Sequence, residues 1–299
     1  MGYFEIRGVI PPMITPFKEN GDVDYEKFVK NIKLWNEYDL AGYLVLGSNS
    51  ETVFLNEEEK LKLIELTVEN AAEDKMVMVG TGMESTRETI SLTNKAAQLG
   101  ADCALILTPF YYGGKMNDDA LISYYREVAD NVTIPILIYN VTKFTHVNIS
   151  KNAIKELSKH ENIIGMKDSS GSIPQLVDFK SVVEDKKFNL MIGTASAWYP
   201  ALQLGVVGSV MALANCSPQE CIDIQSLFDK GEFEKSCQIY TKMFPVNQAV
   251  TGEFGIAGLK YACDLLGYEG GHVRSPLKQL KAEDKNKVKA ILDNAELIK

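Results

Sequence analysis

The strongest constraint on the fold is a regular alternation of short apolar runs with amphipathic stretches along the 299-residue chain. The apolar runs are continuous and do not alternate with polar residues, which is typical of parallel strands buried on both faces. Eight such runs, each followed by a helix, predict an α/β protein of the (β/α)8 barrel class. The expected strands cover residues 8–17, 41–47, 76–82, 103–110, 135–141, 162–169, 189–195 and 208–214.

Helix start signals lie between the apolar runs. Asn56 precedes the charged run EEEK and is followed three residues later by Glu59, an arrangement close to a capping box. Similar capping side chains open three other amphipathic stretches. We therefore expect helices to begin at Asp24, Asn56, Ser85 and Asn117.

The pattern changes after the eighth apolar run. From about residue 218 onward the sequence is helical only, through FEKSCQIYTKMF, GIAGLKYACDLLG and AEDKNKVKAILDNAELI. No linker rich in Pro, Gly or Ser precedes this part, so we expect it to form one structural unit with the barrel. The predicted organisation is a barrel over residues 1–228 and a C-terminal helical extension over residues 229–299.

An open, doubly wound parallel sheet is the competing architecture. That fold binds a dinucleotide at a G-x-G-x-x-G turn after its first strand. The segment ITPFKENGD, which follows the start of the first apolar run, contains no such turn. The barrel is therefore the favoured prediction.

The balance of charges limits the partners of the chain. There are 31 Lys and Arg against 40 Asp and Glu, a formal net charge of −9, so the surface should repel nucleic acid and anionic membranes. No segment has the length of a membrane span, and the opening MGYFEIRGVIPPM does not resemble a secretion signal. We expect no nucleic acid and no membrane partner.

Cysteine and histidine usage bears on compartment and on metals. The five cysteines are odd in number, widely spread and without a C-x-x-C pair, which favours a reducing cytoplasm over a disulfide framework. The three histidines are isolated, and no pair has metal-ligand spacing with acids or thiols. We expect no metal site.

Chemically distinctive residues lie where the predicted strands end, which is where a (β/α)8 barrel places its reacting groups. The sixth run ends in GMKDSSG and carries Lys167, whose ammonium is costly in a buried strand unless it is paired or its lowered pKa is its purpose. The fifth run ends in YN, at Tyr139, and the fourth in TPFYY, at Tyr111. The second ends in GSNSE, a turn whose N–H, hydroxyl and amide donors suit a carboxylate.

Each of these features alone has a simpler explanation, since strand-end lysines usually extend to water and turns rich in Gly, Ser and Asn are mostly only turns. Their coincidence at one end of one barrel favours a shared function. A desolvated Lys167 would have a pKa lowered from about 10.4 towards neutrality, and its free amine could attack a ketone. Tyr139 could transfer the protons that this reaction needs. A 2-oxo acid supplies both the ketone and the carboxylate.

These motifs give a specific resemblance. Over nearly the whole chain, from PPMITPF to RSPLKQL, the sequence resembles the pyruvate-dependent class I lyases typified by dihydrodipicolinate synthase and N-acetylneuraminate lyase, through GSNSE, TPFYY, YNV and GMKDSSG. The resemblance implies that Lys167 forms the Schiff base and that Tyr139 relays protons. It also implies that Ser48 and Asn49 bind the substrate carboxylate.

The resemblance further implies secondary substrate-binding positions at Thr15 and Ser169. Members of this family are commonly homotetramers built as dimers of dimers, in which the counterpart of Tyr111 reaches into the site of a neighbouring subunit. We therefore expect a homotetramer with Tyr111 as a catalytic residue.

Three positions depart from the family pattern. Ser50 stands where the family turn usually has Gly, which would narrow or reshape the anion site. After YNV the family often continues P-x-R-T-G, but here Thr142 replaces the proline and Phe144 replaces the substrate-binding arginine. This change argues against a dihydrodipicolinate synthase, and GTASAW at 193–198 lacks the acidic residues of sialic acid lyases. The combination of GSN with KDS is more similar to 4-hydroxy-2-oxoglutarate aldolases and 2-keto-3-deoxy sugar acid aldolases or dehydratases.

The predicted function is that of a class I lyase that forms an imine between Lys167 and pyruvate, or another 2-oxo acid, and makes or breaks the adjacent C–C bond. The partners are small molecules, a 2-oxo acid and an aldehyde, and no cofactor is expected because the protonated imine is the electron sink. Three alternatives stay open: a dihydrodipicolinate synthase, a dehydratase of keto-deoxy sugar acids, and a barrel that binds a 2-oxo acid without catalysis.

Overall fold

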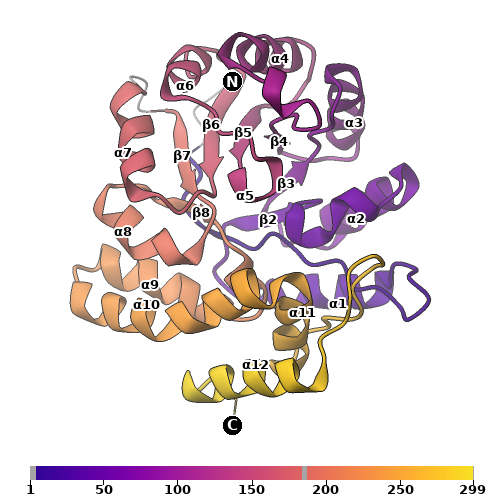
Figure 1. Ribbon diagram of the computed structural model, residues 1–299, viewed down its shortest axis with the longest axis vertical. Coiled ribbons are helices and arrows are strands. Elements are labelled where there is room, and N and C mark those ends of the chain that lie inside the picture. Colours follow the sequence, from indigo (N-terminus) through magenta and orange to yellow (C-terminus); the bar gives the residue numbers. More distant parts are fainter. Residues whose placement is uncertain (1–4, 184–186, 299) are drawn as a thin grey trace. The chain divides into compact units, whose positions relative to one another are not determined.

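The computed structural model describes residues 5–183 and 187–298. Within these ranges, eight parallel strands alternate with helices in the order of a (β/α)8 barrel, which confirms the predicted fold class (Figure 1). The described chain forms two compact units, residues 5–7 with 76–210 and residues 8–75 with 211–298. The division predicted at residue 228 stays a prediction. The strands are β1 (Gly8–Ile10), β2 (Gly42–Val45), β3 (Met76–Gly80), β4 (Cys103–Leu107), β5 (Ile136–Asn140), β6 (Ile163–Asp168), β7 (Asn189–Ile192) and β8 (Gly208–Val210).

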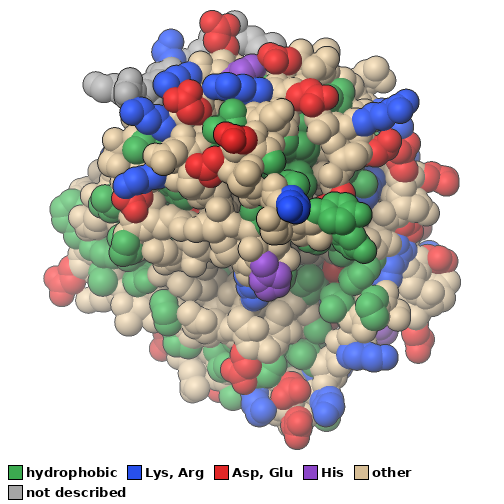
Figure 2. Space-filling view, turned by 45° about the horizontal axis from the view of Figure 1, so that its top comes forward, with side chains coloured by type: hydrophobic (Ala, Val, Ile, Leu, Met, Phe, Trp, Pro, Cys, Tyr) green, Lys and Arg blue, Asp and Glu red, His purple; other side chains and the backbone are tan. Residues whose placement is uncertain are grey.

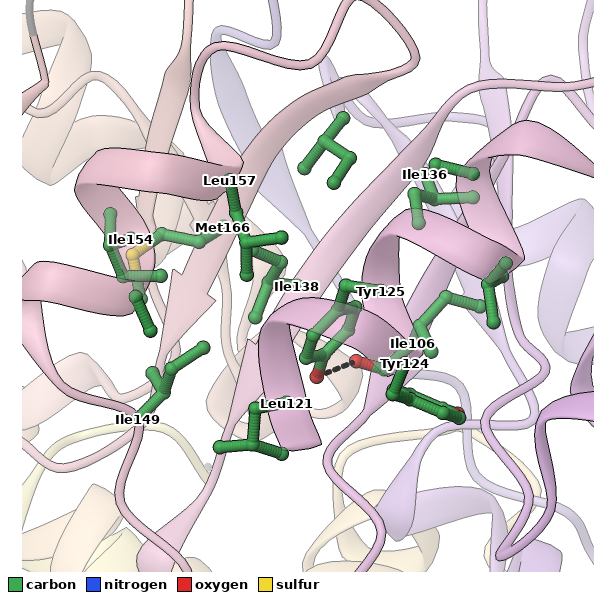
Figure 3. Close-up of a cluster of buried hydrophobic side chains, with 14 of the residues drawn as sticks. Ile106, Leu121, Tyr124, Tyr125, Ile136, Ile138, Ile149, Ile154, Leu157 and Met166 are labelled. Atoms are coloured by element: carbon green, nitrogen blue, oxygen red, sulfur yellow. Dashed lines mark hydrogen bonds between the residues drawn. The ribbon is translucent and has the colours of Figure 1, made fainter. Parts of the chain in front are cut away.

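The first unit holds strands β3 to β8, which pair in parallel with their neighbours in chain order. Side chains of β4, β5 and β6 pack against the neighbouring helices in a buried hydrophobic cluster (Figure 3). Tyr125 belongs to this cluster, and its hydroxyl donates to the carbonyl of Ile106 over 3.0 Å. The helices of this unit are α3 (Thr86–Gln98), α4 (Asp118–Asp130), α5 (Thr142–Thr145), α6 (Lys151–Leu157), α7 (Ile173–Val182) and α8 (Trp198–Gln203).

The second unit contains β1 and β2 together with the C-terminal helices. Its buried core includes Trp35, whose ring stacks on Tyr268 and whose indole N–H donates to the carbonyl of Asn215. Helices α9 and α10 lie side by side, and α12 packs against α10 and α11 (Figure 1). The helices are α1 (Tyr25–Trp35), α2 (Glu57–Asn70), α9 (Pro218–Asp229), α10 (Phe233–Asn247), α11 (Gly255–Leu265) and α12 (Ala282–Asn294).

The predicted helix starts are confirmed. Asp24, Asn56, Ser85 and Asn117 are all N-caps, and each side chain accepts a hydrogen bond from a backbone N–H in the first turn. Asn56 and Glu59 form a complete capping box. These short side-chain oxygens satisfy N–H groups that have no partner within the helix.

The strands are shorter than the apolar runs that predicted them, most clearly at β1. The run covers residues 8–17, whereas the strand ends at Ile10 because Pro11 and Pro12 lack the N–H that a ladder needs. Beyond the prolines the chain stays extended, and Met13 N–H donates to the carbonyl of Leu44 over 2.9 Å. Residues 11–13 therefore stay beside β2 without forming a regular strand.

The surface carries charges of both signs. On the face shown in Figure 2, Lys and Arg side chains are interspersed with Asp and Glu. None of the described helices is long and apolar enough to cross a membrane.

Candidate active site

Lys167 and Tyr139 face each other in the first unit. Lys167 lies near the end of β6 with only 3% of its surface exposed. Tyr139 is its register partner on β5, and Lys167 Nζ lies 4.2 Å from the centre of the tyrosine ring. The side chains predicted to form the imine and to relay protons are thus in contact.

Burial sets the electrostatics of Lys167. Desolvation of the ammonium lowers the pKa of Lys167 from its ordinary value, and the nearby Tyr139 hydroxyl opposes this effect by raising it. A lower pKa leaves a larger fraction of the amine unprotonated near neutral pH. The free amine is the form that attacks a ketone.

Asp168, the next residue, is held on the other face of β6, since successive strand side chains alternate. Its carboxylate accepts hydrogen bonds from Asn140 Nδ2 at 2.8 Å, Gln175 Nε2 at 3.1 Å and Ser170 Oγ at 2.5 Å. These donors occupy the carboxylate on the side of the strand opposite to Lys167. The network fixes the end of β6 without placing Asp168 beside the amine.

Asn140 and Gln175 were not singled out in the sequence. Asn140 is fully buried, and besides its bond to Asp168 its Oδ1 accepts from the N–H of Ile149. A polar residue directly after a strand-end tyrosine was a usable signal for Asn140. Gln175 had no such signal, because it lies in α7 and its hydrogen bond to Asp168 cannot be inferred from the neighbouring residues.

Ser169 lies beside Lys167, and the glycine that follows the next strand leaves space for both side chains. The Ser169 Oγ is buried and has no hydrogen-bond partner in the described chain. A Cβ built on Gly193, which follows β7, would lie 1.8 Å from Ser169 Oγ and 2.8 Å from Lys167 Cε. Only glycine fits there, and it leaves the Ser169 hydroxyl available next to the amine.

Tyr111 occupies a different setting in the first unit. It is 75% exposed, and its ring lies 5.0 Å from that of Tyr112 in an edge-to-face contact. The carboxylate of Glu84 accepts the backbone N–H groups of Phe110 at 3.1 Å and Tyr111 at 2.9 Å. Glu84, which the sequence did not single out, therefore fixes the loop that presents Tyr111 to solvent.

The departure from the family pattern after β5 also lies on the surface of this unit. Phe144 in α5 is 50% exposed. The neighbouring Lys143 places its Nζ 5.5 Å from the centre of the Phe144 ring. A phenyl ring thus stands where the family pattern has an arginine, with the ammonium of the preceding residue close to it.

In the second unit, Ser48 and Asn49 lie in a single 3₁₀ turn, η1 (Ser48–Ser50), which follows β2 after Leu46 and Gly47. Both are partly exposed. The turn ends at Glu51, which has a left-handed conformation with φ 55°. Ser48 and Asn49 are therefore accessible at the end of their strand, as the anion-site prediction requires.

Thr15 and Ser50 are buried in the same unit. The Thr15 Oγ1 has no hydrogen-bond partner in the described chain. The Ser50 hydroxyl donates to the carbonyl of Met13 over 2.6 Å. The serine that replaces the family glycine thus ties its turn to residues 13–15, and its hydroxyl is engaged with the backbone.

Within the residues that the structure describes, no three or more His, Cys, Asp or Glu side chains are grouped so that they could hold a metal ion.

Comparison with known proteins gives full-length matches. A family model described as the dihydrodipicolinate synthetase family matches residues 5–295. A 4-hydroxy-tetrahydrodipicolinate synthase of Methanothrix thermoacetophila is 32% identical over 286 residues, which cover 96% of each chain. The protein of the same name from Bartonella bacilliformis is 33% identical over 295 residues, 98% of this chain and 99% of that one. Among solved structures, a dihydrodipicolinate synthase from Thermotoga maritima superposes with a TM-score of 0.93 at 26% identity, over 99% of this chain and 100% of that chain.

Proposed function

The chain belongs to the dihydrodipicolinate synthetase family, and from this premise we propose that Lys167 forms an imine with pyruvate and that the enzyme makes or breaks the C–C bond next to it. The membership confirms the predicted family and the predicted class of enzyme, a pyruvate-dependent Schiff-base lyase. The observation that carries the assignment to Lys167 is its buried amine in contact with Tyr139.

The proposed reaction begins with attack of the Lys167 amine on C2 of pyruvate. Proton transfer gives a carbinolamine, and loss of its hydroxyl as water gives the protonated imine. Removal of a proton from C3 then forms an enamine, whose C3 attacks an aldehyde carbon in the forward direction. Hydrolysis of the new imine releases product and restores the amine. The cationic imine accepts the electron pair at the C–C bond step, so a further electron sink is not required.

Tyr139 has the proposed role of moving the protons. Its ring lies against the amine and its hydroxyl interacts with the same group, which places the hydroxyl close to the carbinolamine that would form there. Ser169 has an unpartnered hydroxyl next to the same amine and is proposed to bind the oxygen that leaves C2 or the hydroxyl of the longer substrate. An unsatisfied buried hydroxyl is costly, and a substrate oxygen would relieve that cost.

The carboxylate of the 2-oxo acid is proposed to bind Ser48 and Asn49. Their accessible turn offers hydroxyl, amide and backbone donors, a set that favours an anion. Thr15 adds a buried hydroxyl without a partner. These assignments are part of the proposal and rest on the residue types and on their position after β1 and β2.

For the second substrate, we propose an aldehyde that bears a carboxylate. The names of the relatives favour the synthase reaction, for which the test aldehyde is aspartate semialdehyde. A second candidate is favoured by Phe144, which replaces the arginine of the family pattern and lacks its charge. On that reading the enzyme is an aldolase whose aldehyde is glyoxylate, the fragment that 4-hydroxy-2-oxoglutarate releases.

We also propose a homotetramer in the cytoplasm. Tyr111 is supported as a contributor to a neighbouring subunit's site by its exposure and by the fixed loop that carries it. The cytoplasmic location is supported by the five free cysteines, four of them buried.

Pyruvate consumption tests the function and separates the two aldehydes. Wild-type enzyme should consume pyruvate with one of aspartate semialdehyde or glyoxylate, and Lys167→Met should consume none with either. Consumption by Lys167→Met at the wild-type rate would overturn the role of this lysine. Pyruvate binding without consumption of pyruvate or cleavage of hydroxylated 2-oxo acids would instead favour the non-catalytic binding protein.

A further inference from the structure

A buried ion pair stands directly behind the turn proposed to bind the carboxylate. Glu51, the residue after η1, is 1% exposed and has φ 55°, a left-handed conformation that residues other than Gly, Asn and Asp rarely adopt. The carboxylate Oε1 lies 2.5 Å from the Nζ of Lys260 in α11. The Oε2 accepts the backbone N–H of Arg274 at 2.8 Å.

Lys260 extends the connection to the segment that carries Thr15. Lys260 is 1% exposed, and its ammonium donates to the carbonyls of Thr15 at 2.7 Å and His272 at 2.6 Å. The same Nζ lies 4.6 Å from the centre of the Phe17 ring. Burial lowers the pKa of Lys260 to about 8, against the opposing effect of Glu51. One ammonium thus joins the Glu51 carboxylate to the backbone of a second segment with a proposed role in binding.

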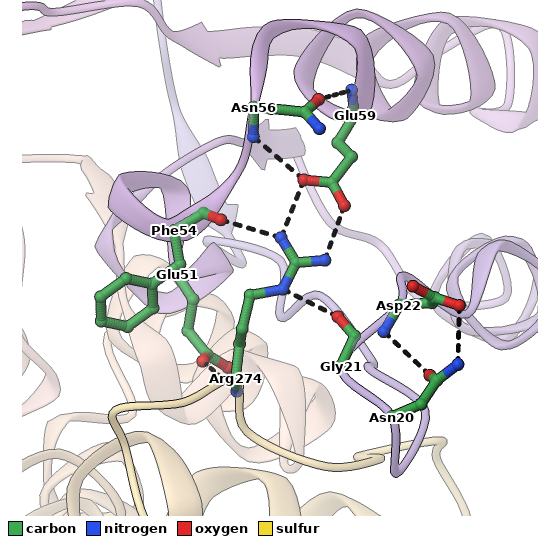
Figure 4. Close-up of polar contacts among 8 residues, drawn as sticks. All are labelled: Asn20, Gly21, Asp22, Glu51, Phe54, Asn56, Glu59 and Arg274. Carbon is green, nitrogen blue, oxygen red and sulfur yellow. Dashed lines mark hydrogen bonds and ion pairs between the residues drawn. The ribbon is translucent and has the colours of Figure 1, made fainter.

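Arg274 binds residues that follow the same turn in the chain, as Figure 4 shows. Its guanidinium forms two bonds with the Glu59 carboxylate, at 2.6 and 2.8 Å, and donates to the carbonyl of Phe54 at 2.8 Å. Phe54 ends η2 (Thr52–Phe54), which begins right after Glu51. The chain from residue 48 to 54 is therefore held at Glu51 and at Phe54 by groups from the C-terminal part of the second unit.

Stability alone is a poor reason for such a pair. Replacing a buried ion pair by well-packed apolar residues is often neutral or stabilising, because desolvation offsets the attraction of the charges. The left-handed backbone of Glu51 adds a further cost that Gly would avoid. The charges instead fix the local geometry. The buried Lys260 ammonium keeps its partners only when the Glu51 carboxylate and the Thr15 carbonyl both lie close to its Nζ.

We propose that Glu51 and Lys260 are positioning residues for the proposed function, and that their ion pair holds the turn of Ser48 and Asn49 in the conformation that binds the carboxylate of the 2-oxo acid. Neither side chain is required to touch the substrate. The pair acts through the backbone of the turn and, by way of Lys260, through that of Thr15. This inference rests on the proposed binding role of the turn.

The test compares two ketones that differ in their carboxylate. Pyruvate has the carboxylate, and acetone has the ketone without it. Each ketone is titrated into wild-type protein and into Glu51→Gln, the imine is reduced with borohydride, and the adduct is quantified by intact mass. For Glu51→Gln we expect the pyruvate concentration that gives half-maximal trapping to rise about tenfold. Trapping of acetone should stay unchanged.

A matched control is Asn31→Leu. Asn31 is a buried residue of the same unit whose side chain forms two hydrogen bonds with the backbone of Glu269. This variant should lose thermal stability and keep the wild-type half-saturation for pyruvate. If Glu51→Gln does not fold, the double variant Glu51→Gln/Lys260→Met, which has no unpaired charge, takes its place under the same criteria.

Two results would overturn the inference. If the concentration that gives half-maximal trapping rises equally for pyruvate and acetone, the pair has a general structural role. If a folded variant traps both ketones like the wild type, the pair has no positioning role. Failure of the proposed function is separate, because wild-type protein would then form no adduct with pyruvate at any concentration.

Discussion

Lys167 on β6 and Tyr139 on β5 are register partners, and the amine of the first lies 4.2 Å from the ring centre of the second. Both side chains point to the same face because residues paired in register on adjacent strands share a face of the sheet. The contact joins a nucleophile with a group that can carry a proton.

Replacing Tyr139 by Phe should lower kcat about 10²- to 10⁴-fold, the range expected when a general acid–base group is removed. The ring that packs against Lys167 is kept, so the melting temperature should change little. The exposed Tyr112 is the control, since Tyr112→Phe removes a hydroxyl with no proposed role. Normal turnover by Tyr139→Phe would assign the proton transfers to another group.

Replacing Lys167 by Met should stabilise the folded protein at pH 7 by about 0.5–2 kcal/mol. Burial lowers the pKa of Lys167 in the folded state, whereas in the unfolded chain it is about 10.4. At pH values between the folded-state and the unfolded-state pKa of Lys167, the unfolded chain therefore binds more protons than the folded protein. The stability of the wild-type protein rises with pH across that window. The advantage of the Met variant should be largest below the folded-state pKa and should disappear above about pH 10.5.

Denaturant unfolding of the wild-type and Lys167→Met proteins at pH 7 and pH 10.5 measures this difference. A variant that is less stable than the wild type at both pH values would show that the lysine contributes more by packing than it costs by desolvation.

Gly193→Ala should impair both stability and imine formation. The new methyl group would lie 1.8 Å from Ser169 Oγ and 2.8 Å from Lys167 Cε, so one of these side chains must move. We expect a loss of about 1–3 kcal/mol in unfolding free energy, as for other overpacked sites. Gly114→Ala is the control, because a Cβ there meets no atom within 4 Å. Equal behaviour of the two variants in denaturant unfolding and in trapping would contradict the crowding at Gly193.

Asn140→Leu should destabilise the protein by about 1–3 kcal/mol, because the Asp168 carboxylate and the Ile149 N–H each lose a partner in a buried setting. Asn148→Ala removes an exposed amide from the edge of the same network and should cost much less. Thermal unfolding ranks the two variants. A larger loss of stability for Asn148→Ala than for Asn140→Leu would mean that the buried hydrogen bond to Asp168 contributes little to the stability of the fold.

Much of the fold was predictable because it is encoded locally. The capping side chains at Asn56 and Ser85 satisfy N–H groups in their own first turns, so neighbouring residues contain the whole signal. The residues after β1 show where local reading falls short. The apolar run continues through residue 17, but its two prolines cannot donate to a ladder, so a run read as one strand becomes a short strand and an extended tail.

The site was predictable where its chemistry is unusual and hidden where it depends on partners far along the chain. Lys167 was identifiable because an ammonium in an apolar strand needs a reason. The role of Glu51 was not, although the residue ends the GSNSE motif, since its partner Lys260 lies in the C-terminal part. That Ser50 reshapes the anion site stays a prediction, and the bond from its hydroxyl to the carbonyl of Met13 depends on a partner that only the folded backbone supplies.

The proposed mechanism requires that Lys167 carry the substrate as an imine. Its most direct test is borohydride reduction of the protein in the presence of pyruvate, followed by proteolysis and mass spectrometry of the peptides. We expect one added pyruvate-derived group per chain, on the peptide that contains Lys167, and none in Lys167→Met. An adduct on another lysine, or no adduct on folded wild-type protein, would contradict it.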